Sequence, residues 1–441
     1  AIARWSIMER PRNDSAASHS ILVVGALDTK GDEVRFLRDR LAAAGLTATV
    51  VDIGILGPPA FQADVPREEI ARAAGESITE LAAAADRGCA IAAMHRGLAA
   101  WVCERRKKGH RDGMIAIGGS AGTAIATAGM RELPIGAPKL MVSTMASGDV
   151  RPYVGTSDLC MMYSVADFAG LNCLTSTVLA NAADAIAGMC GSRASLPVVS
   201  GRTLLAATMF GNTTPCVNRV KELLEDRGYE LLVFHATGTG GQAMERLVVD
   251  DFVKGVLDIT TTELADELVG GVLTAGPHRL EAAGRMCVPQ IISVGALDMV
   301  NFGAPETIPS KFKGRLFYQH NPAVTLMRTT PEENRKLGEM LAQKLNQAKG
   351  PVVLLLPLQG VSGIDYPGKP FFDPIADESL FDALRTNIGP NVKLVELDRH
   401  INDPEFASAI VDEFVKCATA PFMQSVGAFA VPGSGEGRYL D

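Results

Sequence analysis

Short apolar runs, each followed by a turn and an amphipathic segment, recur along most of this 441-residue chain. The first run, Ile21–Val24, predicts a buried strand that ends in a tight turn. A helix is predicted at Val34–Ala44, with Leu37 and Leu41 on one face and Gly45 as its end. Strands that alternate with helices in this way are typical of a parallel sheet covered by helices. The pattern therefore predicts an α/β fold with mainly parallel sheets.

The second half of the chain repeats the pattern of the first. With a shift of 183 residues (228 − 45 and 235 − 52), Gly45 falls on Gly228, and Asp52 falls on His235 at the end of the second predicted strand. Further along, DGMIAIGGSAGT parallels KGVLDITTTELA, and PKLMVSTMASG parallels PQIISVGALDM. We therefore expect two Rossmann-like domains of one pseudo-repeated design.

The composition changes to Pro, Gly and Ser at Ser195–Arg202, where we place the domain boundary. A nucleotide-binding domain is expected at residues 20–197 and a second Rossmann-like domain at residues 198–420. Residues 1–19 lack the apolar core of a signal peptide, and residues 421–441 are polar and rich in Gly. We expect a flexible leader and a flexible tail there.

Composition and charge narrow the classes of function. The net charge of −8 argues against a nucleic-acid-binding surface, which needs a strong positive field. Since no run of eighteen apolar residues occurs, no membrane span is expected. The eight cysteines are scattered without a C-x-x-C pair, which favours buried, reduced thiols in a cytoplasmic protein over a structural zinc site.

Glycines and hydroxyl side chains follow several predicted strands of the first half. The strongest candidate is Gly118–Thr123, where glycines let the backbone approach an anion and a helix N-terminus supplies unpaired N–H groups. Lys30 lies near a neighbouring strand end and supplies a positive charge. Asp28 or Asp158, also near strand ends, are the candidate ligands of Mg²⁺. The predicted nucleotide site comprises Asp28, Thr29, Lys30, Gly118, Gly119, Ser120, Gly122, Thr123, Ser143, Thr144, Ser147, Gly148, Thr156, Ser157 and Asp158. Turns that only cap helices are the alternative.

In the second half the strand ends carry histidines and carboxylates instead. An imidazole titrates close to neutrality, so these residues could perform acid–base catalysis. The candidate catalytic residues are His235, Asp258, Glu263, Asp298, His320 and His400. Capping or core hydrogen bonds are the alternative role for each histidine, and no H-x-x-x-H spacing supports a metal site.

Two other glycine-rich segments match nucleotide motifs only in part. Gly363–Pro370 follows the P-loop pattern until Pro370 replaces the Ser or Thr that would hold Mg²⁺. Gly238–Ala243, with Asp258 twenty residues after its first glycine, fits the dinucleotide fingerprint, but it follows the second strand of its domain rather than the first. We therefore favour neither.

Taken together, the motifs resemble those of the Tm-1-like ATP-binding family, also called UPF0261. The resemblance spans about residues 20–418 and rests on GALDTKGDE, GMIAIGGSAGT, MASGDVRPYVGTSDL, MFGNTTPCV, VFHATGTGGQAME, GVLDITTTELAD, SVGALDMVNFG, LMRTT and HINDPEFA. It implies two Rossmann-like domains, a homodimer, and ATP bound in the amino-terminal part. The motif and the physical argument agree on Lys30, Gly118–Thr123, Thr144 and Ser147–Gly148.

Three functions follow from these observations. The first is an ATP-binding protein that uses ATP with Mg²⁺, or a small-molecule substrate in the interdomain cleft, as a transferase or ligase would. The second is a lyase, isomerase or hydrolase of a small acid that uses the second-domain His and Asp residues, with ATP only regulatory. The third is a non-catalytic module that binds nucleotide and a protein partner.

Overall fold

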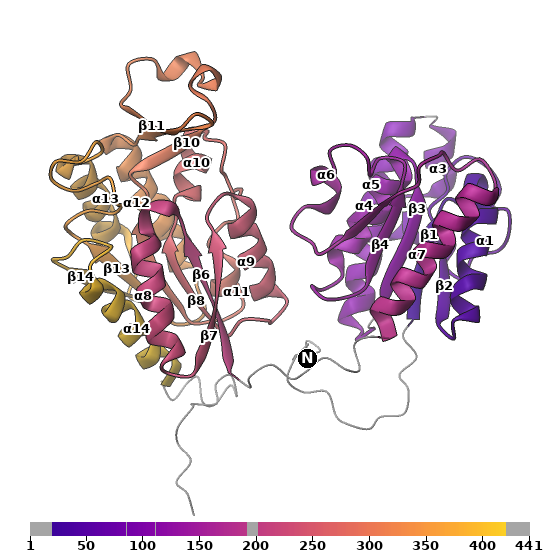
Figure 1. Ribbon diagram of the computed structural model, residues 1–441, viewed down its shortest axis with the longest axis horizontal. Coiled ribbons are helices and arrows are strands. Elements are labelled where there is room, and N and C mark those ends of the chain that lie inside the picture. The colour runs from indigo at the N-terminus through magenta and orange to yellow at the C-terminus, as the bar shows by residue number, and fades with distance from the viewer. Residues whose placement is uncertain (1–19, 85, 111, 192–201, 420–441) are drawn as a thin grey trace, which may run out of the picture. The chain divides into compact units, whose positions relative to one another are not determined.

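The computed structural model describes residues 20–84, 86–110, 112–191 and 202–419 (Figure 1). Residues 20–191 belong to one compact unit, the first unit, and residues 202–419 to another, the second unit. Each unit is an α/β layer structure around a parallel sheet, so the predicted fold class is confirmed. The predicted leader, the predicted tail and the predicted boundary at Ser195–Arg202 fall almost wholly outside the described residues.

The sheet of the first unit has five parallel strands in the order β2-β1-β3-β4-β5. Gly118 pairs with Ser143 and Ser143 with Tyr163, so β3, β4 and β5 end level with one another. We call the edge at which the parallel strands of a sheet end its carboxyl edge, and the opposite one its amino edge. The strands are β1 (Ser20–Gly25), β2 (Thr47–Asp52), β3 (Gly113–Gly118), β4 (Lys139–Ser143) and β5 (Cys160–Tyr163).

Helices cover both faces of this sheet (Figure 1). Ile21 and Val23 of β1 pack with α1 and α7 on one face, whereas Leu22 and Val24 pack with α4 and α5 on the other. A strand that is buried on both faces needs a continuous apolar run rather than an alternating one. The helices are α1 (Leu27–Ala43), α2 (Arg67–Ala73), α3 (Ile78–Ala83), α4 (Arg87–Lys107), α5 (Ser120–Glu132), α6 (Arg151–Val154) and α7 (Cys173–Gly191).

The second unit is built around six parallel strands in the order β14-β13-β9-β8-β6-β7. A small antiparallel sheet, β10-β12-β11, continues from β9. The strands are β6 (Thr203–Met209), β7 (Tyr229–His235), β8 (Gly255–Thr260), β9 (Gln290–Gly295), β10 (Met299–Phe302), β11 (Phe317–Asn321), β12 (Val324–Arg328), β13 (Val352–Pro357) and β14 (Val392–Leu397). The helices are α8 (Thr214–Glu225), α9 (Thr239–Val249), α10 (Glu263–Val269), α11 (Ala282–Arg285), α12 (Pro331–Asn346), α13 (Pro374–Asn387) and α14 (Pro404–Thr419), with 3₁₀ turns η2 (Gly211–Thr213), η3 (Pro305–Thr307) and η4 (Ser310–Phe312).

The two sheets share one strand order, as the sequence repeat predicts. In each unit the first strand lies between the second and the third, and the fourth follows: β2-β1-β3-β4 and β7-β6-β8-β9. Gly45 and Gly228 both have left-handed backbones, with φ of 78° and 80°, after the first helix of each sheet. Asp52 and His235 are the last residues of β2 and β7. Ligands of such sheets bind at the carboxyl edge where the strand order reverses, which is between β1 and β3 and between β6 and β8.

One helix of the described residues, α7, is long and apolar enough to span a membrane by length and composition alone. The same helix packs against α1 and buries Leu179 and Ile186 in the core of the first unit. Core helices of soluble proteins meet the same criterion, so this is weak evidence for a span.

Candidate functional site

The start of α5 lies at the carboxyl edge of the first sheet, directly after β3. Gly119 is its N-cap residue and makes no side-chain cap hydrogen bond, and the helix begins at Ser120. A Cβ on Gly118 would lie 2.8 Å from the Cα of Gly122, so this tight turn requires glycine. Ser120 is exposed, and Gly119 and Gly122 are partly exposed. Because first-turn N–H groups have no acceptor within a helix, this end presents unpaired donors to a ligand.

The hydroxyl groups beside α5 have two different roles. Thr123 and Ser143 are fully buried, and their hydroxyls share a hydrogen bond of 2.6 Å that joins α5 to β4. Thr144 is half-buried, and its Oγ1 lies 3.7 Å from where a Cβ on Gly119 would stand. Ser147 and Gly148 are exposed in the turn that follows β4. The structure therefore brings Ser120 and Thr144 to the start of α5, and uses Thr123 and Ser143 inside the core.

The start of α1, by contrast, is already occupied by the chain's own carboxylates. Asp52 is 2% exposed, and its Oδ1 accepts hydrogen bonds from the backbone N–H groups of Leu27 (3.0 Å) and Gly54 (2.8 Å). Burial raises the pKa of Asp52, although these bonds oppose the shift. Oδ2 of Asp28 accepts from three consecutive N–H groups at 2.7 to 3.2 Å, those of residues 55–57. Asp28 thus holds the loop after β2, and Thr29 is exposed beside it.

Lys30 lies near this edge but already has a partner. Its Nζ donates to the backbone oxygen of Phe168 (3.2 Å) and lies 5.6 Å from the centre of the Phe168 ring. Residue 30 also has non-helical angles, with φ of −136° and ψ of 28°, at a kink in α1. The helix begins at Leu27, earlier than the predicted Val34, because Asp52 caps its first turn.

Thr156, Ser157 and Asp158 do not join the other predicted nucleotide-site residues. Oδ1 of Asp158 forms an ion pair with Nζ of Lys139 (2.6 Å), and Oδ2 accepts from the backbone N–H of Gly136 (2.6 Å). Lys139 is the first residue of β4, which places Asp158 at the amino edge of the sheet. A magnesium ion at the start of α5 is therefore beyond the reach of Asp158.

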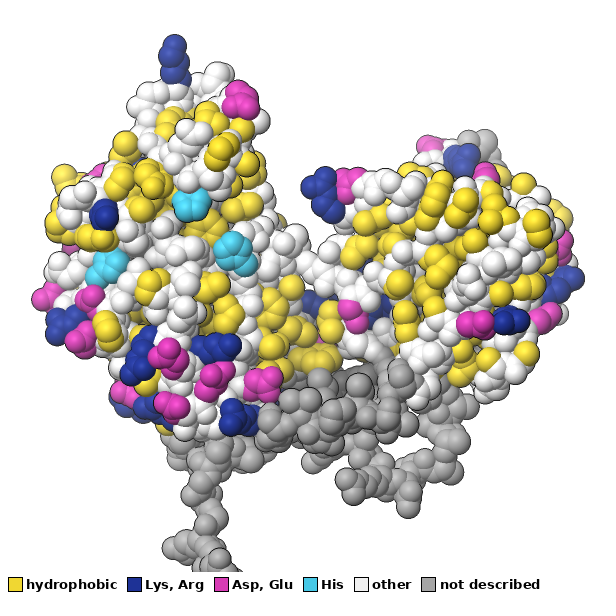
Figure 2. Space-filling model, in the orientation of Figure 1, with side chains coloured by type: hydrophobic (Ala, Val, Ile, Leu, Met, Phe, Trp, Pro, Cys, Tyr) yellow, Lys and Arg dark blue, Asp and Glu magenta, His cyan; other side chains and the backbone are white. Residues whose placement is uncertain are grey.

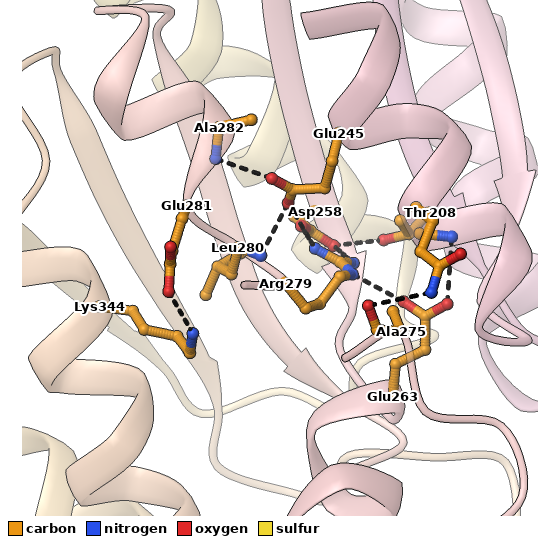
Figure 3. Close-up of polar contacts among 12 residues, drawn as sticks. Thr208, Glu245, Asp258, Glu263, Ala275, Arg279, Leu280, Glu281, Ala282 and Lys344 are labelled. Carbon is orange, nitrogen blue, oxygen red and sulfur yellow. Dashed lines mark hydrogen bonds and ion pairs between the residues drawn. The ribbon is translucent and has the colours of Figure 1, made fainter. Parts of the chain in front are cut away.

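In the second unit a buried arginine, Arg279, gathers three acidic side chains (Figure 3). Its Nη2 donates to Oδ1 of Asp258 (2.6 Å) and its Nε donates to Oε2 of Glu263 (2.7 Å); all three residues are at most 1% exposed. Glu245 lies 3.4 Å from Nη1. Burial alone would lower the pKa of Arg279, but the carboxylates raise it well above its ordinary value. Asp258 and Glu263, predicted to be catalytic, are thus enclosed within an ion cluster.

Glu263 also accounts for the glycines in Gly238–Ala243, the segment that fits the dinucleotide fingerprint. Its Oε1 accepts from the N–H groups of Gly238 (2.7 Å) and Gly241 (3.1 Å), so a carboxylate of the chain sits where a cofactor phosphate would. A Cβ on Gly241 would lie 2.2 Å from Oε2 of Glu263, and one on Gly240 would lie 1.8 Å from the backbone oxygen of His235. These glycines admit the acidic side chain and the neighbouring backbone.

Asp298 belongs to a second buried cluster, with Asp365, Asp377 and Arg328. Its Oδ2 accepts from the hydroxyl of Ser362 (2.7 Å). Burial, and next the charge of Asp365, raises the pKa of Asp298 to about 7. Asp298 is fully buried and feels the charge of Arg328, whereas Asp258 and Glu263 form ion pairs with Arg279. Asp298 therefore lies in a different buried cluster from Asp258 and Glu263.

The three candidate histidines have different surroundings, and histidine side chains appear at several places on the visible face of the second unit in Figure 2. His235 is exposed and stacks on Phe210, with ring centres 5.4 Å apart. His320 is exposed on β11. Nδ1 of His400 accepts from the N–H of Asn402 (3.1 Å), so its Nε2 carries the proton and donates to the backbone oxygen of Ser362 (2.9 Å). Neither nitrogen of His400 remains available as a base.

Neither a cluster of metal-binding side chains nor the cavity beside α4 adds a competing site at the carboxyl edges within the described residues. No group of three or more His, Cys, Asp or Glu side chains in this part of the chain is arranged to hold a metal ion. A cavity of about 450 Å³ lies against α2 and the C-terminal half of α4. It is lined by residues such as Trp101 and Arg105, and by none of the predicted site residues.

Comparisons with known proteins agree with the two-unit architecture. The family models described as "Uncharacterised protein family (UPF0261)" match residues 19–195 with the N-terminal domain and residues 202–418 with the C-terminal domain. A UPF0261 protein of Clostridium tetani is 49% identical over 397 residues, covering 90% of this chain and 98% of its own length. One of Mesorhizobium japonicum is 48% identical over 392 residues, covering 88% of this chain and 97% of its own length.

A plant relative and a solved structure complete the comparison. The tomato (Solanum lycopersicum) ToMV resistance protein Tm-1(GCR237) is 42% identical over 420 residues, covering 90% of this chain but only 56% of the tomato protein. The structure of glycosyltransferase VinC in complex with dTDP covers 92% of this chain and 98% of its own, at 10% identity and a TM-score of 0.16, which is too low to support any argument. The resemblance predicted from the motifs is confirmed: the chain belongs to the UPF0261 family.

Proposed function

We propose that the first unit binds the phosphate groups of a nucleotide, ATP in particular, at the start of α5. The observation that carries the proposal is a glycine-capped helix N-terminus at the strand-order reversal, with Ser120 and Thr144 beside it. Such a terminus attracts anions through its unpaired N–H groups and its partial positive charge. The resemblance to a family named for ATP binding supports ATP as the nucleotide.

A comparison with the starts of α1, α9 and α10 supports this choice of helix. Asp52 fills the start of α1, Glu263 fills the start of α9, and α10 begins with Glu263 itself. An added phosphate would meet a buried negative charge at each of these places, which is unfavourable. The first turn of α5 contains no acidic residue. Among these helix starts, α5 offers a phosphate the most favourable charge environment.

Magnesium would be held chiefly by the phosphates and water, as is usual for nucleotide sites. The hydroxyls of Ser120 and Thr144 would lie beside it, since Asp158 pairs with Lys139 and Oδ2 of Asp28 accepts hydrogen bonds from the loop after β2. Lys30 would add positive charge by exchanging the backbone oxygen of Phe168 for a phosphate oxygen. Catalysis by the second-unit carboxylates is less favoured because Asp258, Glu263 and Asp298 are buried.

Calorimetric titration with ATP, ADP, AMP and tripolyphosphate, each with Mg²⁺, tests the proposal. Affinity is expected to fall from ATP to AMP, and tripolyphosphate is expected to compete with ATP, because the phosphates make the contacts. Complete absence of ATP binding would contradict the proposal. Phosphate release measured on the same samples separates an ATP-consuming enzyme from a binding module.

Replacing Lys30 with alanine is expected to weaken ATP binding by about 10- to 100-fold, since a hydrogen bond to a charged group contributes about 1.5–3 kcal/mol. Lys107→Ala is the matched control, because this lysine is exposed on α4 and forms a surface ion pair with Glu104 (3.5 Å). Equal affinities for Lys30→Ala and Lys107→Ala would remove Lys30 from the site.

The homodimer that the resemblance implies is a separate proposal, which sedimentation of the unmodified protein tests.

A further inference from the structure

Residues 358–373, between β13 and α13, form a loop over the carboxyl edge of the six-stranded sheet. The N–H of Gly363 donates to the backbone oxygen of Asn212 just beyond β6 (2.9 Å), and the N–H of Ala296 just beyond β9 donates to that of Val361 (2.9 Å). Loops of this length without their own secondary structure often act as lids or binding loops. This loop covers the edge at which a parallel sheet binds ligands.

One guanidinium and three carboxyl groups fasten the loop to the unit beneath it. Arg328 of β12 donates through Nε to the backbone oxygen of Phe371 (2.7 Å) and through Nη2 to Oδ1 of Asp377 on α13 (2.6 Å). Its Nη2 lies 3.7 Å from Oδ1 of Asp365 in the loop. Asp298 holds the loop through Ser362. We call Asp298, Arg328, Asp365 and Asp377 the loop cluster; each member is at most 7% exposed.

In the loop cluster the charges do not balance, and two carboxylate oxygens have no hydrogen-bond partner among the described residues. If ionised, its three carboxylates and one guanidinium would carry a net charge of −2 (1 − 3) in a buried site. Oδ1 of Asp298 and Oδ1 of Asp365 are buried and have no hydrogen-bond partner among the described residues. Buried polar atoms of this kind normally bind a proton, a water or an ion. The cluster therefore lacks a positively charged component.

Other titratable groups near the loop cluster do not supply that component. The Asp373 side chain accepts from the first turn of α13, and Glu333 of α12 pairs with Arg315. Both ring nitrogens of His400 contact the backbone, at Asn402 and at Ser362, rather than a member of the loop cluster. A metal ion would lie against the guanidinium of Arg328, 3.7 Å from Asp365, and would be repelled by it. Protons are the cations that fit.

We propose that protons bound by Asp298 and Asp377 hold loop 358–373 closed over the carboxyl edge, and that their loss opens it. Burial raises the pKa of Asp365 as well, although the charge of Arg328 and the hydrogen bond that its Oδ2 accepts from the N–H of Val361 (3.0 Å) favour its ionised form. Opening would release both carboxyls to water and uncover the strand ends at Asn212 and Ala296. The loop is thus a flap controlled by pH.

The direction of the pH effect follows from the closed state. Burial, followed by the charge of Asp365, raises the pKa of Asp377 to about 8 and that of Asp298 to about 7. In the open loop both carboxyls return toward the ordinary aspartate pKa of about 3.9. The closed state therefore holds protons that the open state releases. Closure is fully favoured below the ordinary pKa and is lost progressively as the pH rises to about 8.

Hydrogen exchange of residues 358–373 between pH 5 and pH 9, corrected for the intrinsic pH dependence of exchange, tests this inference in the full-length protein. The opening constant is expected to rise about tenfold per pH unit for each bound proton between pH 5 and pH 7, and to level off above pH 8. Asp377→Asn keeps the size of the side chain and an oxygen that can accept from Arg328, but it removes a titrating proton, so it should reduce the slope. Combined with Asp298→Asn it should make the opening nearly independent of pH.

Asp398→Asn is the matched control, since the exposed Asp398 contacts Gln359 of the same loop and lies outside the loop cluster. The opening constant of this variant should change with pH as steeply as that of the unmodified protein. A wild-type opening constant that does not change with pH would overturn the inference without any variant. So would an unchanged slope in a folded Asp298→Asn, Asp377→Asn protein. Protection of the loop by Mg²⁺ or Ca²⁺ at pH 8 would replace it with a metal site.

Discussion

Replacing Arg279 with methionine is expected to lower the free energy of unfolding of the second unit by about 3–5 kcal/mol, the usual cost of removing one partner from a buried ion pair. Arg279 is 1% exposed and contacts Asp258, Glu263 and Glu245. Methionine fills much of the same volume, so the loss would come from the buried carboxylates rather than from a large cavity.

The same variant should make stability depend on pH. Without the guanidinium, burial favours the protonated forms of the three carboxyls, which raises their pKa values in the folded variant. A raised folded-state pKa gives stability that is present at low pH and lost as the pH rises. Arg279→Met is therefore expected to lose more stability at pH 8 than at pH 5. Urea unfolding followed by circular dichroism, with hydrogen exchange of residues 202–419, measures both effects.

Arg285→Met is the matched control. Arg285 is more than half exposed and pairs with Glu281 on the surface, so its loss should change stability by less than about 1 kcal/mol. If Arg279→Met were as stable as Arg285→Met at both pH values, the cluster of Figure 3 would not stabilise the second unit. Glu263 would then be available for another role at the start of α9.

Gly119→Asp is expected to reduce the affinity for ATP by about 100-fold or more while leaving the fold intact. With φ of −80° the backbone of Gly119 suits any residue, and a Cβ there would meet only Thr144 Oγ1 at 3.7 Å. The new carboxylate would accept from the first-turn N–H groups of α5, as a good N-cap does, and would repel a phosphate. Several lost charge-assisted hydrogen bonds of about 1.5–3 kcal/mol each account for the size of the effect.

Two further variants separate the causes. Gly119→Asn caps the helix without a charge, so it should weaken ATP binding less than Gly119→Asp does. Ser77→Asp places the same charge at the N-cap of α3 and should leave the affinity unchanged. Titration of all three with ATP and tripolyphosphate, together with thermal unfolding, provides the comparison. Unchanged ATP affinity in a folded Gly119→Asp protein would exclude the start of α5 as the nucleotide site.

Among the candidate residues, sequence reasoning succeeded where the signal was local. Gly118–Gly122 could be recognised because a strand, a glycine turn and a helix start follow one another within a few residues. Asp28, Asp158, Asp258 and Glu263 also follow or adjoin strands, but their partners could not be recognised from their neighbours. Arg279, which decides the role of Asp258 and Glu263, lies in a loop without any periodic pattern.

The sequence by itself determined the α/β class, the two pseudo-repeated halves and the family. These follow from apolar runs such as Ile21–Val24 and Val352–Leu356, since a strand buried on both faces needs a continuous apolar run wherever it lies in the sheet. Tertiary structure alone decided which helix start remains open to a ligand. Asp52 reaches Leu27 across 25 positions, and Glu263 reaches Gly238 across 25. These carboxylates bind N–H groups at a helix start that is distant in the sequence. The neighbouring residues therefore do not reveal the contact, because only the packing of the sheet brings the two segments together.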